Sequence, residues 1–238
     1  MKIGNNLSNS RYKLNENSEY YVIDKGRKSV KQEKRAMRRI CKDVAQNPST
    51  KCKLLPVVFI KKEEIAQHLE TTEAWKHLNE KYELGIQYDW LARFALSNGL
   101  KLEVGLEKSN RSKAVAALTG ESQLQTSVDA GISVMTIDKS RSTNNARLIF
   151  GNLMFPASLW NCTKEDEVKK YREWGYGDTV KKTWFCHDPI LGLPCGQCHP
   201  CQDALNEGMA YRLPWGGVIL GSIRKKVKNF IKMLLGRK

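Results

Sequence analysis

Four cysteines stand close together in the segment TWFCHDPILGLPCGQCHPCQ, residues 183–202. They are Cys186, Cys195, Cys198 and Cys201, with the spacing C-x8-C-x2-C-x2-C. Two intervening residues let both sulfurs of a pair reach one ion at about 2.3 Å, while the backbone turns and offers its amides to the thiolates. Four thiolates satisfy a tetrahedral Zn²⁺ and leave no position for water. The sequence therefore predicts a structural zinc site.

Other interpretations of the same cysteines stay open at the level of sequence. A four-cysteine iron–sulfur cluster also fits C-x2-C-x2-C spacing. His187 or His199 could replace one cysteine as a ligand. The plainest alternative is a set of free thiols with no ligand role. The remaining cysteines, Cys41, Cys52 and Cys162, are expected to be core or surface residues.

The composition is that of a globular protein with a strong positive charge. The chain has 238 residues, of which 41% are hydrophobic and 27% charged, enough for one substantial domain with a small appendage. Forty Lys and Arg against 25 Asp and Glu give a net charge of +15, so the expected partners are polyanions. We expect no transmembrane segment, because no apolar run approaches the roughly 20 residues that cross a bilayer. Without a signal-peptide pattern at the N-terminus, we expect a cytoplasmic location.

Two segments carry nearly all of the positive excess. Residues 25–43 contain nine Lys or Arg and two acids, and residues 216–238 contain seven Lys or Arg and no acid. Each segment could bind a nucleotide, RNA or an anionic membrane, or could be the solvated face of a surface helix. The apolar residues of 215–238 recur at helical spacing, which predicts a basic amphipathic helix after a hinge at residues 214–217. Packing on its own domain or on a partner subunit, including a homo-oligomer, is the alternative to lipid.

Hydrophobic periodicity in the rest of the chain indicates an α/β fold. Strand patterns at 19–24, 54–60 and 100–106 alternate with helical patterns at 28–44, 62–70, 72–82, 87–97 and 163–174. Because hairpin signals are lacking between these patterns, we expect a Rossmann-like, mainly parallel sheet flanked by helices. Thr163 and Asp166 predict a capping box for the last helix, and Gly175 its end. Residues 119–146 are rich in small polar residues and predict a mobile loop with one short strand at 132–137.

Several short motifs in the C-terminal half occur in the order found in one enzyme family. They are the FP of Phe155-Pro156, Thr163-Lys164 at a helix start, TWFC at 183–186 and CGQCHPC at 195–201. In this region, residues 155–214, the chain resembles the 7-cyano-7-deazaguanine synthase family, which consists of ATP-dependent enzymes of the PP-loop superfamily. In that family the four cysteines bind zinc, and the resemblance implies the same role for the four cysteines here.

The resemblance extends more loosely upstream. IDKGRKSVKQEKRAMRRI at 23–40 is similar to the family's second strand, its D-x-G turn and the following helix, and QYDWLARFA at 87–95 is similar to the next unit. The implied chemistry is ATP-dependent adenylation of a carboxylate followed by attack of an amine. In the family, this ligase reaction with ammonia converts 7-carboxy-7-deazaguanine into an amide and then a nitrile, a step of queuosine biosynthesis. The resemblance thus implies ATP as a second cofactor beside zinc.

The family's catalytic signature does not occur in this sequence. An S-G-G-x-D-S loop holds the ATP pyrophosphate in the family, whereas LSNS at 7–10 lacks both glycines and therefore the close backbone approach that a phosphate needs. No catalytic or ATP-binding residue is assigned, although Asp24 and Asp178 are placed where a carboxylate could face a nucleotide or substrate. Three explanations stay open: a longer chain contains the loop, a partner supplies it, or the chain is a non-catalytic binding or assembly subunit.

Together these observations predict four parts. They are a flexible N-terminus at 1–18, an incomplete PP-loop-type α/β domain at 19–182, a four-cysteine zinc-binding segment at 183–214 and a basic amphipathic helix at 215–238.

Overall fold

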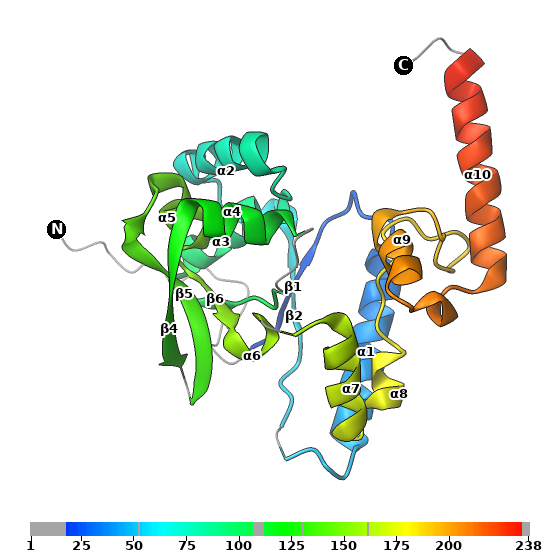
Figure 1. Cartoon of the computed structure of the whole chain (residues 1–238), viewed down its shortest axis with the longest axis horizontal. Coiled ribbons are helices and arrows are strands. Elements are labelled where there is room, and N and C mark those ends of the chain that lie inside the picture. Colours follow the sequence, from blue (N-terminus) through cyan, green and yellow to red (C-terminus); the bar gives the residue numbers. More distant parts are fainter. Residues whose placement is uncertain (1–17, 52, 107–111, 130, 161, 235–238) are drawn as a thin grey trace. The chain divides into compact units, whose positions relative to one another are not determined.

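The structure is a computed structural model that divides into two compact units (Figure 1). The described residues are 18–51, 53–106, 112–129, 131–160 and 162–234. The first unit comprises the chain up to Val22 together with Leu55–Lys169, and the second comprises Ile23–Leu54 with Lys170–Lys238. Each unit is therefore assembled from two stretches that are far apart in the sequence. The expected flexible N-terminus, apart from residue 18, and Cys52 lie outside the described residues.

The first unit contains the sheets and the larger hydrophobic core. Its strands are β1 (Tyr20–Ile23, at the unit boundary), β2 (Val58–Lys61), β3 (Leu102–Glu103), β4 (Ser122–Asp129), β5 (Ile132–Ser142) and β6 (Leu153–Pro156). Its helices are α2 (Leu69–Tyr82), α3 (Gln87–Asn98), α4 (Lys113–Glu121), α5 (Asn144–Phe150) and α6 (Ala157–Trp160), with a 3-10 turn at Lys62–Glu64. The core is centred on Leu78, Leu118, Phe150 and Phe155, each with less than 2% of its surface exposed.

The second unit is helical and contains the four cysteines. Its helices are α1 (Val30–Gln46), α7 (Lys164–Glu173, which crosses the unit boundary), α8 (Gly177–Val180), α9 (His199–Asn206) and α10 (Trp215–Leu234), with a 3-10 turn at Ala210–Arg212. The capping box of α7 is confirmed, since the Asp166 amide donates to Thr163 Oγ1 at 3.2 Å and the Thr163 amide donates to Asp166 Oδ2 at 3.0 Å. Gly175, at φ 80°, lies just after this helix, as predicted.

The fold is mixed α/β, but its four-stranded sheet is not mainly parallel. The strand order is β3-β6-β5-β4, in which β3 and β6 are parallel while β5 is antiparallel to both β6 and β4; β1 and β2 form a separate two-stranded sheet. The antiparallel pairs arise where a loop was expected at 119–146, because β4 and β5 form a long hairpin there. Most residues of β4 are exposed and polar, so this strand lacks the apolar pattern from which a strand is predicted. In β5, by contrast, Val134 and Ile137 are buried.

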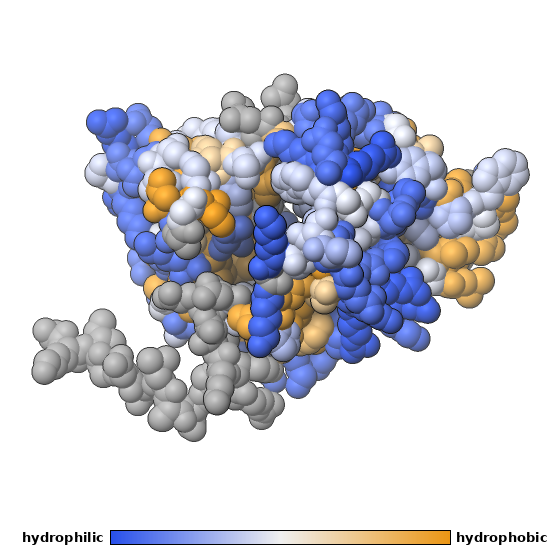
Figure 2. All heavy atoms as spheres, turned by 90° about the horizontal axis from the view of Figure 1, so that it is seen from below, coloured by the Kyte–Doolittle hydropathy of each residue, from blue (hydrophilic) through white to orange (hydrophobic). Residues whose placement is uncertain are grey.

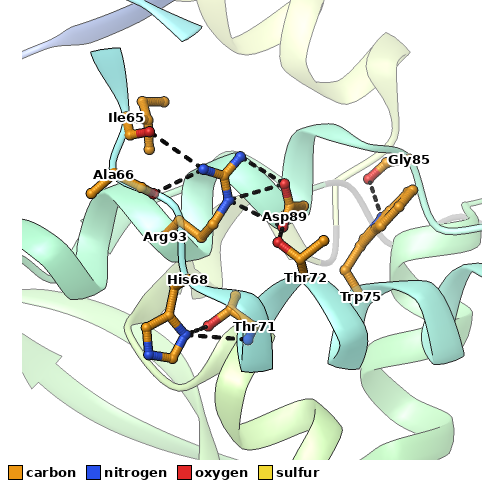
Figure 3. A network of polar contacts seen from close by, with 9 residues as sticks. All are labelled: Ile65, Ala66, His68, Thr71, Thr72, Trp75, Gly85, Asp89 and Arg93. Carbon is orange, nitrogen blue, oxygen red and sulfur yellow. Dashed lines mark hydrogen bonds and ion pairs between the residues drawn. The ribbon is translucent and has the colours of Figure 1, made fainter. Parts of the chain in front are cut away.

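The predicted helix at 62–70 is also wrong, and a buried ion pair gives the reason. The guanidinium of Arg93 binds the Asp89 carboxylate at 2.8 Å and donates to the carbonyl of Ala66 at 2.9 Å and that of Ile65 at 3.5 Å (Figure 3). Because these carbonyls point toward Arg93, they do not accept the backbone hydrogen bonds that an α-helix at 62–70 would require. After the 3-10 turn at Lys62–Glu64 the backbone is extended at Ile65 and at His68, whose Nδ1 accepts from the Thr71 amide and caps α2.

The same ion pair joins α3 to α2. Thr72 Oγ1 on α2 donates to Asp89 Oδ1 at 2.8 Å, and only 4% of Asp89 and 6% of Arg93 are exposed. On the same helix as Thr72, the Trp75 indole N–H donates to the carbonyl oxygen of Leu84 and to that of Gly85, the second of which Figure 3 shows. Because each buried charge has its partners, the cluster fixes how the two helices lie against each other instead of leaving an uncompensated charge.

Removal of Arg93 should destabilise the first unit strongly. The Arg93→Met variant leaves the Asp89 carboxylate buried without its partner, which costs about 3–5 kcal/mol in the free energy of unfolding. Lys76→Met is the matched control, because the Lys76–Glu73 pair is exposed and contributes less than about 1 kcal/mol. Urea unfolding followed by circular dichroism measures both. Equal effects of the two substitutions would contradict this role for Arg93.

Candidate metal centre

The structure brings the four predicted cysteines to one point. The Sγ atoms of Cys186, Cys195, Cys198 and Cys201 all lie within 4.8 Å of one another, and all but Cys198 are fully buried. The sulfur of Cys198 lies 3.4 Å from that of Cys201 and 3.8 Å from that of Cys186. Four sulfurs at the corners of a tetrahedron with metal–sulfur bonds of about 2.3 Å are about 3.8 Å apart. The cluster therefore has the size that one metal ion requires.

The local backbone shapes the centre as the C-x2-C spacing predicts. The amides of Gln197 and Cys198 donate to the Cys195 sulfur at 3.4 and 3.3 Å, and the Cys195 amide donates to the Cys186 sulfur at 3.3 Å. Gly196 lies in the turn between Cys195 and Cys198 and has φ 66°, in the left-handed region that favours glycine. Such N–H···S contacts stabilise thiolates over thiols.

Neither histidine of the segment belongs to the group of converging ligand atoms. His199 opens α9 and places its Nδ1 2.9 Å from Asp203 Oδ2, with 84% of its side chain exposed. The ring of His187 is not part of the cluster either, and burial together with the nearby Arg27 lowers its pKa. Among the described residues, the converging ligand set therefore consists of cysteines only.

Burial favours the protonated form of two of these thiols, because it raises their pKa. It raises the pKa of Cys186 to about 12 and also raises that of Cys201. Burial acts in the same direction on Cys198, but hydrogen bonds from the backbone of His187 and Cys201 outweigh it and lower the pKa of Cys198. A divalent cation supplies the charge that converts four such thiols into thiolates. The residues present fit a structural Zn²⁺ for this reason.

Helix α10 packs through glycines directly on residues 186–201, the segment with the four cysteines, which we call the metal loop. A Cβ atom on Gly221 would lie 1.8 Å from the Cys195 carbonyl oxygen, and one on Gly217 would lie 2.2 Å from that of Pro194. From the other side, a Cβ on Gly196 would lie 3.0 Å from a methyl group of Val218. The G-x-x-x-G spacing lets the helix backbone touch the loop, much as small residues do at close helix crossings. Gly216 and Gly217 are thus part of the helix, and the hinge expected at 214–217 is wrong.

Asp188, two residues after the first cysteine, connects both basic helices to the metal loop. Its carboxylate accepts a hydrogen bond at 2.9 Å from Nζ of Lys28, which lies just before α1. It also accepts one at 2.5 Å from the guanidinium of Arg224 on α10. Burial opposes ionisation of Asp188, but Lys28 and Arg224 outweigh it and lower the pKa of this carboxyl. Sequence analysis missed this residue, because its partners are distant in the chain.

The two carboxylates proposed from sequence for a nucleotide or substrate have local structural contacts. Asp24 Oδ1 accepts from the Gly26 amide at 3.0 Å and stabilises the turn after β1. Asp178 is exposed and pairs with Lys181 at 2.8 Å within α8, which lowers the pKa of Asp178. The cysteine cluster remains the one site that the geometry assembles among the described residues.

Comparison with protein-family models, with curated proteins and with solved structures finds no match to this chain. Within the described part of the chain, no helix combines the length and the apolar character needed to span a bilayer.

Metal content should depend on the four clustered cysteines and on no other thiol. We expect one zinc per purified wild-type chain, and a loss of most of it in Cys201→Ser, which removes a buried ligand. Cys162→Ser is the control, because the Cys162 thiol donates to the Ser158 carbonyl outside the cluster. Inductively coupled plasma mass spectrometry gives the metal content and its identity. Iron with labile sulfide in place of zinc, or full metal content in Cys201→Ser, would contradict the assignment.

An added methyl group should be tolerated at Gly216 of α10 but not at Gly221. Gly221→Ala forces α10 away from the metal loop and should cost about 1–3 kcal/mol in the free energy of unfolding of the second unit. Gly216→Ala should be neutral or stabilising by up to about 1 kcal/mol, since its Cβ would meet only a Leu193 methyl at 3.8 Å. Thermal unfolding of the zinc-loaded protein distinguishes the two, and similar melting temperatures would show that α10 does not pack on the loop.

Proposed function

We propose that the cysteine cluster holds one structural Zn²⁺ and that the chain is a relative of the 7-cyano-7-deazaguanine synthases. The observation that carries this proposal is the convergence of four sulfurs from Cys186, Cys195, Cys198 and Cys201. These are the residues on which the resemblance to that family is most specific. The metal has a structural role here, because four protein ligands complete a tetrahedron and leave no position for substrate or water.

The order of elements before the cysteines is compatible with the same family. Strand β1 is followed by the Asp24–Gly26 turn and by helix α1, and the QYDWLARFA motif forms most of α3. A strand, a D-x-G turn and a helix are what the resemblance implies for this stretch. We therefore propose a Rossmann-like, PP-loop-type ancestry for the β1–α1 and α3 units, although the four-stranded sheet is mixed and β1 and β2 form a separate sheet.

The proposed activity is an ATP-dependent C–N ligation on a carboxylate, with a 7-deazapurine as the substrate class. ATP transfers its adenylyl group to a carboxylate oxygen and releases pyrophosphate, and ammonia then displaces AMP to form the amide. The pyrophosphate-binding S-G-G-x-D-S loop is supplied by a longer form of the chain or by a partner. In this proposal, the described residues provide the body of the fold and the metal-braced segment that stabilises it.

Release of pyrophosphate tests this activity directly. With ATP, Mg²⁺, ammonia and 7-carboxy-7-deazaguanine, the zinc-loaded protein together with the subunit that carries the loop should release pyrophosphate only when the carboxylate is present. A coupled phosphatase assay measures the release, and omission of the carboxylate is the control. Zinc-loaded protein that releases none, alone or with the products of neighbouring genes, would remove the ligase proposal and leave the metal site standing.

A second candidate function is a non-catalytic subunit that binds a polyanion such as RNA. The observation that favours it is one stripe of exposed cations on α1, at positions i, i+4, i+7, i+8 and i+11: Lys31, Arg35, Arg38, Arg39 and Lys42. Residues at this spacing share one face of a helix. Retention of RNA that weakens steeply as salt is raised, in the absence of pyrophosphate release, would support this candidate over the ligase.

A further inference from the structure

Within the second unit, no described residue covers the distal half of α10. Gly217 and Gly221 are its buried residues, whereas every residue from Lys225 to Leu234 is exposed. A helical segment of this length is marginal in water unless something packs on its apolar face. The structure therefore presents a helix whose first part is held by the metal loop and whose second part is ready to bind a surface.

The uncovered face of α10 is apolar along the whole helix. At 100° per residue, the apolar side chains fall on one arc whose centre lies about 120° from the glycines that touch the metal loop. They are Ile219, Ile223, Val227, Phe230, Ile231 and Leu234, with 47–67% of each residue exposed. Figure 2 shows this hydrophobic surface at the right-hand edge of the view, over α10. Because the metal loop occupies the other side, it cannot cover this arc.

Two further exposed apolar residues lie near the start of the helix. Trp215, its first residue, is 84% exposed, and Leu191 is 87% exposed at the tip of the Ile190–Leu193 turn. Leu191 has φ 49°, a left-handed conformation that leucine rarely adopts and that asparagine or glycine would suit better. The side chain of Leu193 lies next to Gly216 and Gly217, because a Cβ on either glycine would lie within 3.8 Å of it. This turn is therefore beside the first turn of α10.

The charge of α10 decides between a membrane and a second copy of the chain. Its described residues include five cations, Arg224, Lys225, Lys226, Lys228 and Lys232, and no acid. Two such helices side by side would bring only like charges to their flanks, with no acid to form interhelical pairs. Anionic lipid attracts the same charges, and the arc is wider than the narrow two-position seam of a coiled coil.

We propose that α10 lies in the interface of an anionic lipid bilayer and holds the metal-binding unit at the membrane surface. The apolar arc with Phe230 enters the boundary between headgroups and acyl chains, and Trp215 and Leu191 contact the bilayer beside it. The lysines extend their aliphatic stems over this boundary and place their ammonium groups at the lipid phosphates. The helix lies along the surface and does not cross it.

Flotation of the full-length protein with vesicles tests the proposal. We expect the wild-type chain to float with vesicles of phosphatidylcholine and phosphatidylserine, at least tenfold more strongly than with phosphatidylcholine alone, and less so at high salt. The double substitution Val227→Ser and Phe230→Ser should lower binding at least tenfold. Asn229→Ser, on the opposite face of α10, is the matched control and should bind like wild type. Zinc content and circular dichroism confirm that each variant is folded.

Three results would overturn the proposal. The first is a lack of binding to anionic vesicles at low salt, and the second is binding that the double substitution does not weaken. The third is sedimentation of the wild-type chain as a dimer that the double substitution dissociates, without vesicle binding, which would assign the apolar arc to a second copy. None of these results depends on ligase activity, so the membrane proposal and the proposed function are tested separately.

Discussion

The second unit depends on the convergence of four sulfurs, three of them from fully buried cysteines. This unit has few large apolar side chains of its own in its buried centre, which is formed by Cys186, Cys195, Cys201, Ala204 and Leu213. A small centre of this kind gains stability from a metal ion that ties the separated ends of a loop together, where a larger unit would rely on hydrophobic burial. The first unit contrasts with it, because its leucine and phenylalanine core needs no such ion.

Sequence patterns predicted those parts of the molecule that depend on neighbouring residues. The C-x2-C spacing, the capping box at Thr163 and Asp166 and the amphipathic α1 are local features, and the structure contains each of them. The features that sequence analysis missed depend on contacts between distant residues. Arg93 donates to the carbonyls of Ile65 and Ala66. The hydrophobic periodicity of residues 62–70 contains no sign that these two carbonyls accept from a distant side chain.

The hairpin of β4 and β5 was missed for a different reason. An exposed strand needs no alternation of apolar and polar residues, and the serines, glutamines and single threonine of β4 are typical of a loop. A usable signal lies in Gly131, which has φ 82° and stands directly before the alternating Ile132-Ser133-Val134 of β5. The docking of α10 had a signal as well, since Gly217 and Gly221 are four residues apart in a helix that is otherwise apolar and basic.

The shared carboxylate of Asp188 has a consequence for how the chain is made. Lys28 and Arg224 both bind it, so the second unit is closed only when two segments that are far apart in the sequence meet. On the ribosome, α1 emerges early and the first unit can assemble before α10 leaves the exit tunnel. Completion of the second unit therefore waits for α10, and a nascent chain stalled before Arg224 would present an unfinished second unit to the chaperones of the cell.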